Sequence, residues 1–237
     1  MTRFILAAGS IGLILCLGLP TQGHDVITTH ITFNREISRI VYDRCGSCHR
    51  DGGTAFSLMT YEATRPWAVA IKDETLSRRM PPWGGVKGFG EFRNDQGLTA
   101  EQLELITLWV DGGAPEGNVP DLPAAPKFTD DTSISQPKDG VVVSGDFKID
   151  RTFALDGLQP DSVRDDQVMQ ITAELPNGAI EPLLWLYKYK SKYAHPFLLR
   201  TPLELPPGTV IHGVPPDSKV ILIPASSQSP TAEPHTP

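Results

Sequence analysis

The cysteines Cys45 and Cys48, with His49 directly after the second, constrain this chain of 237 residues more than any other feature. Cys-x-x-Cys-His is the attachment pattern of c-type haem. Two cysteines at this spacing add across the two vinyl groups of one porphyrin edge, and the following histidine lies under the ring, where its nitrogen reaches the iron. The sequence therefore predicts one covalent haem c, with both thiols as anchors and His49 as the proximal ligand.

Three other uses of the cysteine pair are weaker. Structural zinc needs four protein ligands, and the chain has no second cysteine pair. A thioredoxin-type pair is expected near a βαβ unit, whereas the flanking patterns here are helical. A plain disulfide suits an exported protein but leaves the adjacent histidine unexplained. Haem is therefore the favoured interpretation.

Met80 is the expected distal ligand, with Met59 as the alternative. Met80 stands in the run RRMPPW, far enough after His49 for the chain to cross to the opposite face of a porphyrin. Pro81 and Pro82 restrict the backbone, so the thioether sulfur can be aimed at iron with little loss of conformational freedom. We therefore expect His49 and Met80 to be the two metal ligands.

The first residues have the pattern of an export signal. Arg3 precedes the apolar stretch FILAAGSIGLILCLGL, and small residues near Gly23 suit cleavage. We expect a periplasmic or otherwise exported protein with no stable membrane span after cleavage. The alternative is a retained anchor, although the apolar stretch is shorter than the roughly 20 residues that span a bilayer. The formal net charge of −7 argues against binding to nucleic acid.

Helical patterns fill the first half of the expected mature chain. Asn34 is the expected cap of a helix that leads to Cys45, and Thr60 is the expected cap of a second helix. Thr99 and Gln102 fit a capping box at the start of a third helix. These patterns predict a mainly α N-terminal cytochrome c domain.

The second half has a different composition. Residues 118–139 are rich in proline. Short runs rich in β-forming residues follow, separated by turn signals such as PNG and PPG. We expect a small all-β, sandwich-like C-terminal domain. The expected division is signal peptide 1–23, monohaem cytochrome c domain 24–117, proline-rich linker 118–139, small β domain 140–225 and disordered tail 226–237.

The runs TFNREISRIVYDRCGSCHRDGG, RRMPPW and LITLWVDGGAPEG resemble a family of bacterial exported c-type cytochrome domains, over about residues 30–117. The resemblance implies a His49/Met80 haem and electron transfer. Such domains are often fused to copper type II, ascorbate-dependent monooxygenase-like domains, and EPLLWLYKYKSKYAHPFLLRTPLELPPGTVI is similar to the closing β segment of those proteins. Copper centres of that kind need several histidines and a methionine. Since residues 118–237 offer only His195, His212, His235 and Met169, the catalytic copper part is expected to be absent.

The leading functional hypothesis is an exported monohaem cytochrome that carries single electrons between redox partner proteins. Two protein ligands fill both axial positions of the iron, so electron transfer is favoured over enzymatic catalysis. One alternative is a haem-bearing subunit or remnant of a copper-dependent monooxygenase-like oxidoreductase, with a second metal at His195 or His212. Another is a docking subunit of a larger redox complex, which would use the aromatic side chains of Trp185, Tyr187 and Tyr189.

Two further expectations concern the surroundings of the haem. Trp83 and Phe89 are candidates to close over the porphyrin, since an indole N–H can reach a propionate. Arg78, Arg79 and Arg93 are candidates to pair with propionates.

Overall fold

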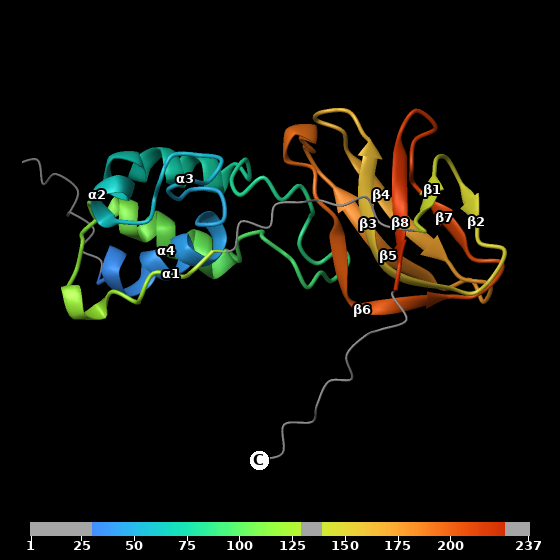
Figure 1. The fold of residues 1–237 in the computed structure, drawn as a ribbon, viewed down its shortest axis with the longest axis horizontal. Helices are drawn as coiled ribbons and strands as arrows, with labels where there is room; N and C mark the ends of the chain where they lie inside the picture. The colour runs from blue at the N-terminus through green and yellow to red at the C-terminus, as the bar shows by residue number, and fades with distance from the viewer. Residues whose placement is uncertain (1–29, 129–138, 226–237) are drawn as a thin grey trace, which may run out of the picture.

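The computed structural model describes residues 30–128 and 139–225. Helical segments form one part of the molecule and two β-sheets form the other (Figure 1). The expected signal peptide and the expected disordered tail lie outside the described residues, as do residues 129–138 of the expected linker. None of the helices in the described ranges is long and apolar enough to cross a membrane.

The helical part consists of short segments. The first stretch is continuous from Phe33 to Cys45 and has π-helical turns on both sides of a short α-helix. The segments are the π-helical turn Phe33–Ile37, α1 (Ser38–Ile40), the π-helical turn Val41–Cys45, α2 (Tyr61–Thr64), the 3-10 turn Arg65–Trp67, α3 (Ala68–Leu76), α4 (Ala100–Asp111) and the 3-10 turn Val119–Asp121.

Local capping explains where these helices begin. Thr60 accepts a hydrogen bond from the backbone of Ala63, and Thr99 forms a reciprocal capping box with Gln102, so both predicted caps are confirmed. The predicted cap at Asn34 is wrong because the Thr32 side chain caps the first turn. The side chain of Asn34, in the turn that Thr32 caps, is buried.

One aromatic cluster joins the first helical segment of this part to α2 and α4. The ring of Phe33 lies 6.2 Å from that of Trp109 and 5.8 Å from that of Tyr61. Trp109 is fully buried, and its indole N–H donates to the carbonyl of Pro115. Phe33, before the Cys-x-x-Cys-His turn, and Tyr61 and Trp109, after it, therefore belong to one packed apolar core.

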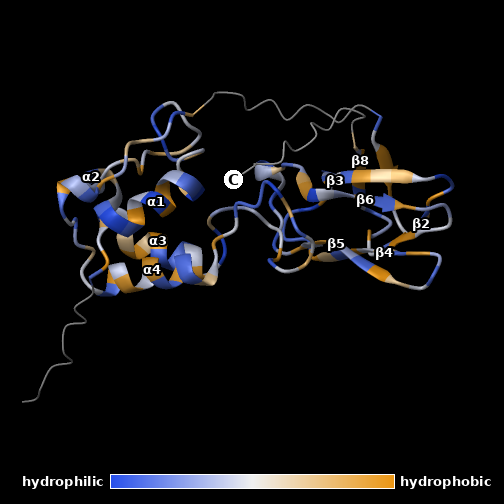
Figure 2. Ribbon diagram, turned by 90° about the horizontal axis from the view of Figure 1, so that it is seen from below, coloured by the Kyte–Doolittle hydropathy of each residue, from blue (hydrophilic) through white to orange (hydrophobic). Residues whose placement is uncertain are grey.

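Within the described residues 139–225, eight strands form two antiparallel four-stranded sheets, in the orders β1-β8-β3-β6 and β2-β7-β4-β5. Figure 2 shows them as two layers, with β8, β3 and β6 in one layer and β4 and β5 in the other. The strands are β1 (Val141–Val143), β2 (Phe147–Lys148), β3 (Phe153–Ser162), β4 (Met169–Glu174), β5 (Ile180–Leu186), β6 (Phe197–Leu205), β7 (Val210–His212) and β8 (Lys219–Pro224).

The core of the β part lies between these sheets. Along β4, Met169, Ile171 and Ala173 are buried, whereas Gln170 and Glu174 are exposed. This alternation is the pattern of a strand with one face on a core. Leu155, Leu158 and Leu222 of the other sheet belong to the same apolar cluster.

The expected fold class, with a mainly helical cytochrome c domain, is wrong. More of the described residues lie in strands than in α-helices, and the longest α-helix, α4, has 12 residues. Glycine and proline interrupt the helical part over residues 50–60 and 77–99, where extended backbone and turns replace helix.

Part of the interrupted region belongs structurally to the sheets. Residues 83–94, which follow α3 after the turn at 77–82, lie along the β part, in the teal-to-green stretch that connects the two halves in Figure 1. Gly85 pairs with Leu186, and Phe92 pairs with Leu199. Residues 83–94 belong to the expected cytochrome domain, 24–117, yet they pair with strands of the expected β domain. The expected domain boundaries themselves stay a prediction.

Candidate functional site

A single turn presents the two cysteines and the histidine. The carbonyl of Cys45, at the end of the first helical stretch, accepts hydrogen bonds from the backbone N–H of Cys48 at 3.1 Å and of His49 at 2.8 Å. Both thiols are free, so the pair forms no disulfide here. The turn therefore places two thiols and an imidazole side by side on one short peptide.

The thiol chemistry argues against a thioredoxin-type pair. Burial, with smaller contributions from the nearby Cys48 and Asp43, raises the pKa of the Cys45 thiol to about 12. A cysteine that attacks disulfides needs a lowered pKa, because the thiolate is the nucleophile. Cys45 instead remains a protonated thiol at neutral pH.

The imidazole of His49 is oriented by a backbone carbonyl. Its Nδ1 lies 2.9 Å from the carbonyl oxygen of Phe56, and since that oxygen can only accept, Nδ1 carries the proton. Nε2 then keeps its lone pair and has no hydrogen-bond partner within residues 30–128 and 139–225. Metal-binding histidines are typically held in this way, with one nitrogen donating to a carbonyl and the other free for the metal.

Large apolar side chains lie exposed beside this imidazole. Phe56 is 51% exposed and packs edge-on to the His49 ring at 5.0 Å, while Trp67, 46% exposed, lies 4.6 Å from Phe56. Val69 and Leu76 of α3 are also exposed. All four side chains fall between the two expected axial ligands in the sequence. Phe56 and Trp67, whose rings contact each other beside His49, form exposed apolar surface of the kind that commonly marks a binding site.

These residues fit a covalently bound haem. The turn supplies two free thiols at the required spacing and an imidazole nitrogen with a free lone pair. The half-exposed rings of Phe56 and Trp67 supply an apolar surface for a porphyrin to cover. Sequence reasoning did not identify Phe56 as the acceptor for His49, because any backbone carbonyl can act in this way and no side-chain type marks it.

Met80 is half-buried in the turn that follows α3. Its backbone N–H donates to the carbonyl of Glu74 at 3.1 Å, and the Arg79 guanidinium makes two hydrogen bonds to the Glu74 carboxylate. In the described residues no hydrogen bond joins Met80 to the Cys45–His49 turn. Met59 is also half-buried, and its carbonyl accepts a hydrogen bond from Tyr42. The choice between the two methionines stays a prediction.

The expected neighbours of the porphyrin lie elsewhere. Trp83 is 5% exposed within the core of the β part, and Phe89 packs against Trp185 of β5, so neither closes over the Cys45–His49 turn. The expectation failed because both side chains belong to the segment that pairs with the sheets.

The arginines proposed for the propionates already have partners in two of the three cases. Arg79 pairs with Glu74, and Arg93 pairs with Asp156 of β3. Arg78 is exposed and has a positive φ of 57°. The pairing of Arg78 with a propionate stays a prediction.

The histidines of the β part lie apart from each other. His195 stacks on Trp83, whereas His212 lies between the carboxylates of Asp146 and Glu174, with N–O distances of 3.1 and 3.3 Å. In the part of the chain that is described, no group of three or more His, Cys, Asp or Glu residues is placed to hold a metal ion.

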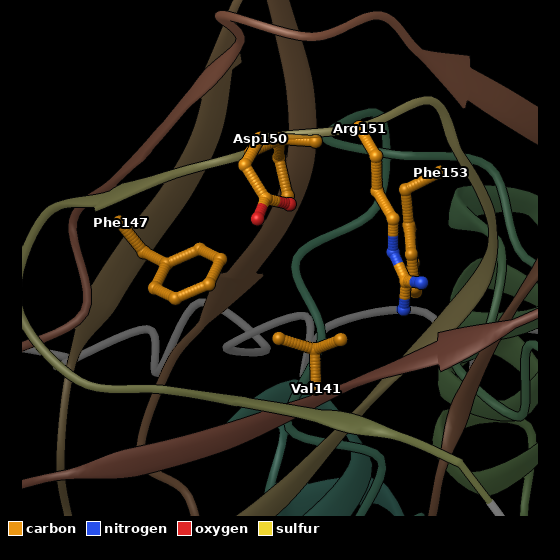
Figure 3. A pocket seen from close by; sticks show the side chains of 6 residues that line it. Val141, Phe147, Asp150, Arg151 and Phe153 are labelled. Carbon is orange, nitrogen blue, oxygen red and sulfur yellow. The ribbon is translucent and has the colours of Figure 1, made fainter.

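Two of the hollows that the described residues form lie outside this site. One of about 190 Å³ lies among β1, β2 and β3 (Figure 3), where Asp150 and Arg151 stand beside the rings of Phe147 and Phe153. The other, of about 450 Å³, has mostly charged walls; it is lined by Asp43, Arg44, Lys87, Phe92, Arg93, Asn94, Asp95, Gln96, Thr99 and Arg200. None of the four expected haem contacts lines either hollow.

Comparison of the chain with protein-family models, with curated proteins and with solved structures found no match. The functional assignment therefore depends on the chemistry of the residues themselves. Among these residues, the Cys45–His49 turn brings two free thiols and a histidine together on one short peptide.

Proposed function

We propose that this chain is an exported electron carrier that uses one covalently attached haem c. The observation that carries the proposal is the orientation of His49, whose Nδ1–H donates to the Phe56 carbonyl and leaves Nε2 for iron. The two free thiols lie in the same turn. The proposed partners are other redox proteins that donate and accept single electrons.

Attachment requires only the two thiols. Cys45 and Cys48 would each add across one vinyl group, with the sulfur bonding to one carbon and the thiol hydrogen going to the other. Two carbon–sulfur bonds form and no oxidant is consumed. The mass of the product is therefore the sum of the polypeptide and one haem.

The axial ligands determine what the site can do. When bound, the haem supplies one-electron chemistry between ferrous and ferric iron. His49, held in one orientation by the Phe56 carbonyl, and Met80, in the turn after α3, would be the two protein ligands of the iron. Because both positions would be occupied by the protein, the site is suited to electron transfer and not to binding a substrate.

Visible spectra of the exported protein test this proposal. We expect oxidised wild-type protein to show the weak sulfur-to-iron band, and Met80→Ala to lose it while keeping the covalent haem. Met59→Ala is the matched control and should retain the band. The opposite result would move the distal ligand to Met59, and colourless wild-type protein from cells that mature c-type cytochromes would refute the proposal.

A further inference from the structure

Residues 83–94 form backbone hydrogen bonds with one edge strand of each sheet. On one side, the carbonyl of Gly84 accepts a hydrogen bond from the backbone of Tyr187 at 2.8 Å, and the backbone N–H of Val86 donates to Trp185 at 2.9 Å. Trp185 belongs to β5, the last strand in its sheet order. The segment thus pairs with an edge strand that would otherwise expose its backbone groups.

The same segment reaches the edge of the other sheet. The backbone N–H of Arg93 donates to Leu198 at 2.9 Å, and that of Arg200 donates to Glu91 at 2.8 Å. The side-chain oxygen of Asn94 accepts from the backbone of Leu198. Since Leu198 and Arg200 lie on β6, the last strand of its own sheet, residues 83–94 lie across one open side of the sandwich.

His195 holds the beginning of this segment. Its ring stacks on the indole of Trp83 with centroids 4.6 Å apart and planes at 13°, and its Nε2 lies 3.0 Å from the Trp83 carbonyl. Phe92 and Phe197 pack edge-on to the same indole. Trp83 is therefore fixed through both its side chain and its backbone.

The hydrogen-bond partners indicate which nitrogen of His195 carries the proton. Burial lowers the pKa of His195, so the ring is neutral at neutral pH and has one N–H. Its Nδ1 faces the Pro196 carbonyl, which already accepts from Asn94 at 2.8 Å. The Trp83 carbonyl has no other hydrogen-bond donor in the described ranges. With the proton on Nε2, both the Trp83 and the Pro196 carbonyls have a donor, whereas with the proton on Nδ1 the Trp83 carbonyl has none.

We infer that His195 is a positioning residue for Met80, acting through Trp83. The inference rests on the proposed function, because Met80 has a role only if it binds iron. Only Pro81 and Pro82 separate Met80 from the anchored Trp83, and both have restricted backbones. On its other side Met80 is held to α3 through the Glu74 carbonyl. The β part thereby limits the movement of the distal ligand.

The rate at which added imidazole displaces Met80 from ferric iron tests this inference. Loss of the sulfur-to-iron band follows the displacement, which requires Met80 to move away. We expect His195→Ala to increase the rate about tenfold, the size expected for the loss of one buried hydrogen bond and its packing. His195→Gln places an amide donor near the position of Nε2 and should restore a rate close to that of wild type.

His212→Ala is the matched control, since His212 lies in the same β part and contacts Asp146 and Glu174, not the segment 83–94. It should leave the rate unchanged. Should His195→Ala fail to fold, Arg93→Gln tests the other end of the segment, where a rate about threefold above that of wild type is expected.

The outcomes distinguish the two proposals. Wild-type protein without haem, or without the sulfur-to-iron band, refutes the proposed function and the inference with it. Wild-type protein with the band, together with folded His195→Ala and Arg93→Gln variants that keep the wild-type rate, overturns the inference alone. An equal acceleration in His212→Ala also overturns it, because general loosening of the sheets would then explain the effect.

Discussion

The guanidinium of Arg93 makes two hydrogen bonds to the carboxylate of Asp156, at 2.9 and 2.7 Å. A third hydrogen bond, to the carbonyl of Leu199, fixes the same group. Asp156 lies on β3, whereas Arg93 comes from the segment that leaves α3, so the pair joins residues 63 positions apart in sequence. The hydrogen bond to Asp156 raises the pKa of Arg93, which therefore remains charged.

This ion pair should contribute modestly to stability. A double-mutant cycle with Arg93→Gln and Asp156→Asn is expected to give a coupling energy of about 0.5 to 1 kcal/mol in urea unfolding, because the pair is partly exposed. The coupling should shrink at high salt. A coupling of zero at low salt would show that the pair does not hold the segment.

Trp83 should stabilise the sandwich as a core residue. Trp83→Ala is expected to lower the free energy of unfolding of the β part by about 3 to 5 kcal/mol, because a buried indole is removed from a packed core. Tyr187→Ala, at a side chain that is 41% exposed, is the control and should have a much smaller effect. Equal losses in urea unfolding would contradict burial of Trp83.

His195 should make the stability depend on pH. Because burial lowers its pKa in the folded protein, the unfolded chain binds a proton more readily, and stability falls as the pH drops from about 6.5 toward the folded value. The limiting slope for one proton is about 1.4 kcal/mol per pH unit. Urea unfolding at several pH values should show a shallower dependence for His195→Phe, and an unchanged slope would contradict the assignment.

The capping box of α4 gives a local test. Thr99→Ala should lower the free energy of unfolding by about 1 kcal/mol, because the N–H of Gln102 loses its acceptor. Thr107→Ala is the matched control in the same helix, where the threonine hydroxyl only donates back to the Leu103 carbonyl. Urea unfolding should separate the two variants, and equal effects would argue against the cap.

Helix caps were predictable from sequence where the capping residue and its partner lie at a fixed short spacing. The caps at Thr60 and Thr99 depend on residues only three positions away, and the structure has both. The choice between Thr32 and Asn34 was not predictable in this way, because both are good capping residues. The side chain of Asn34 is instead drawn inward toward the carbonyl of Gly117, a contact across 83 positions.

Long-range pairing explains the larger errors. Trp83 stands next to Met80 in the sequence pattern and was expected near the porphyrin, yet its partner His195 is 112 positions away. Local spacing carries no information about which sheet edge will accept the segment 83–94. The orientation of His49 was not predictable either, because its partner is a backbone carbonyl, which every residue type carries.

The intact mass of the exported protein, measured under denaturing conditions after expression with a working cytochrome-maturation system, tests the central claim most directly. A covalent bond survives denaturation, so we expect the mature polypeptide plus one haem. The double variant Cys45→Ala, Cys48→Ala should lose that added mass. A wild-type mass equal to that of the bare polypeptide would contradict the account.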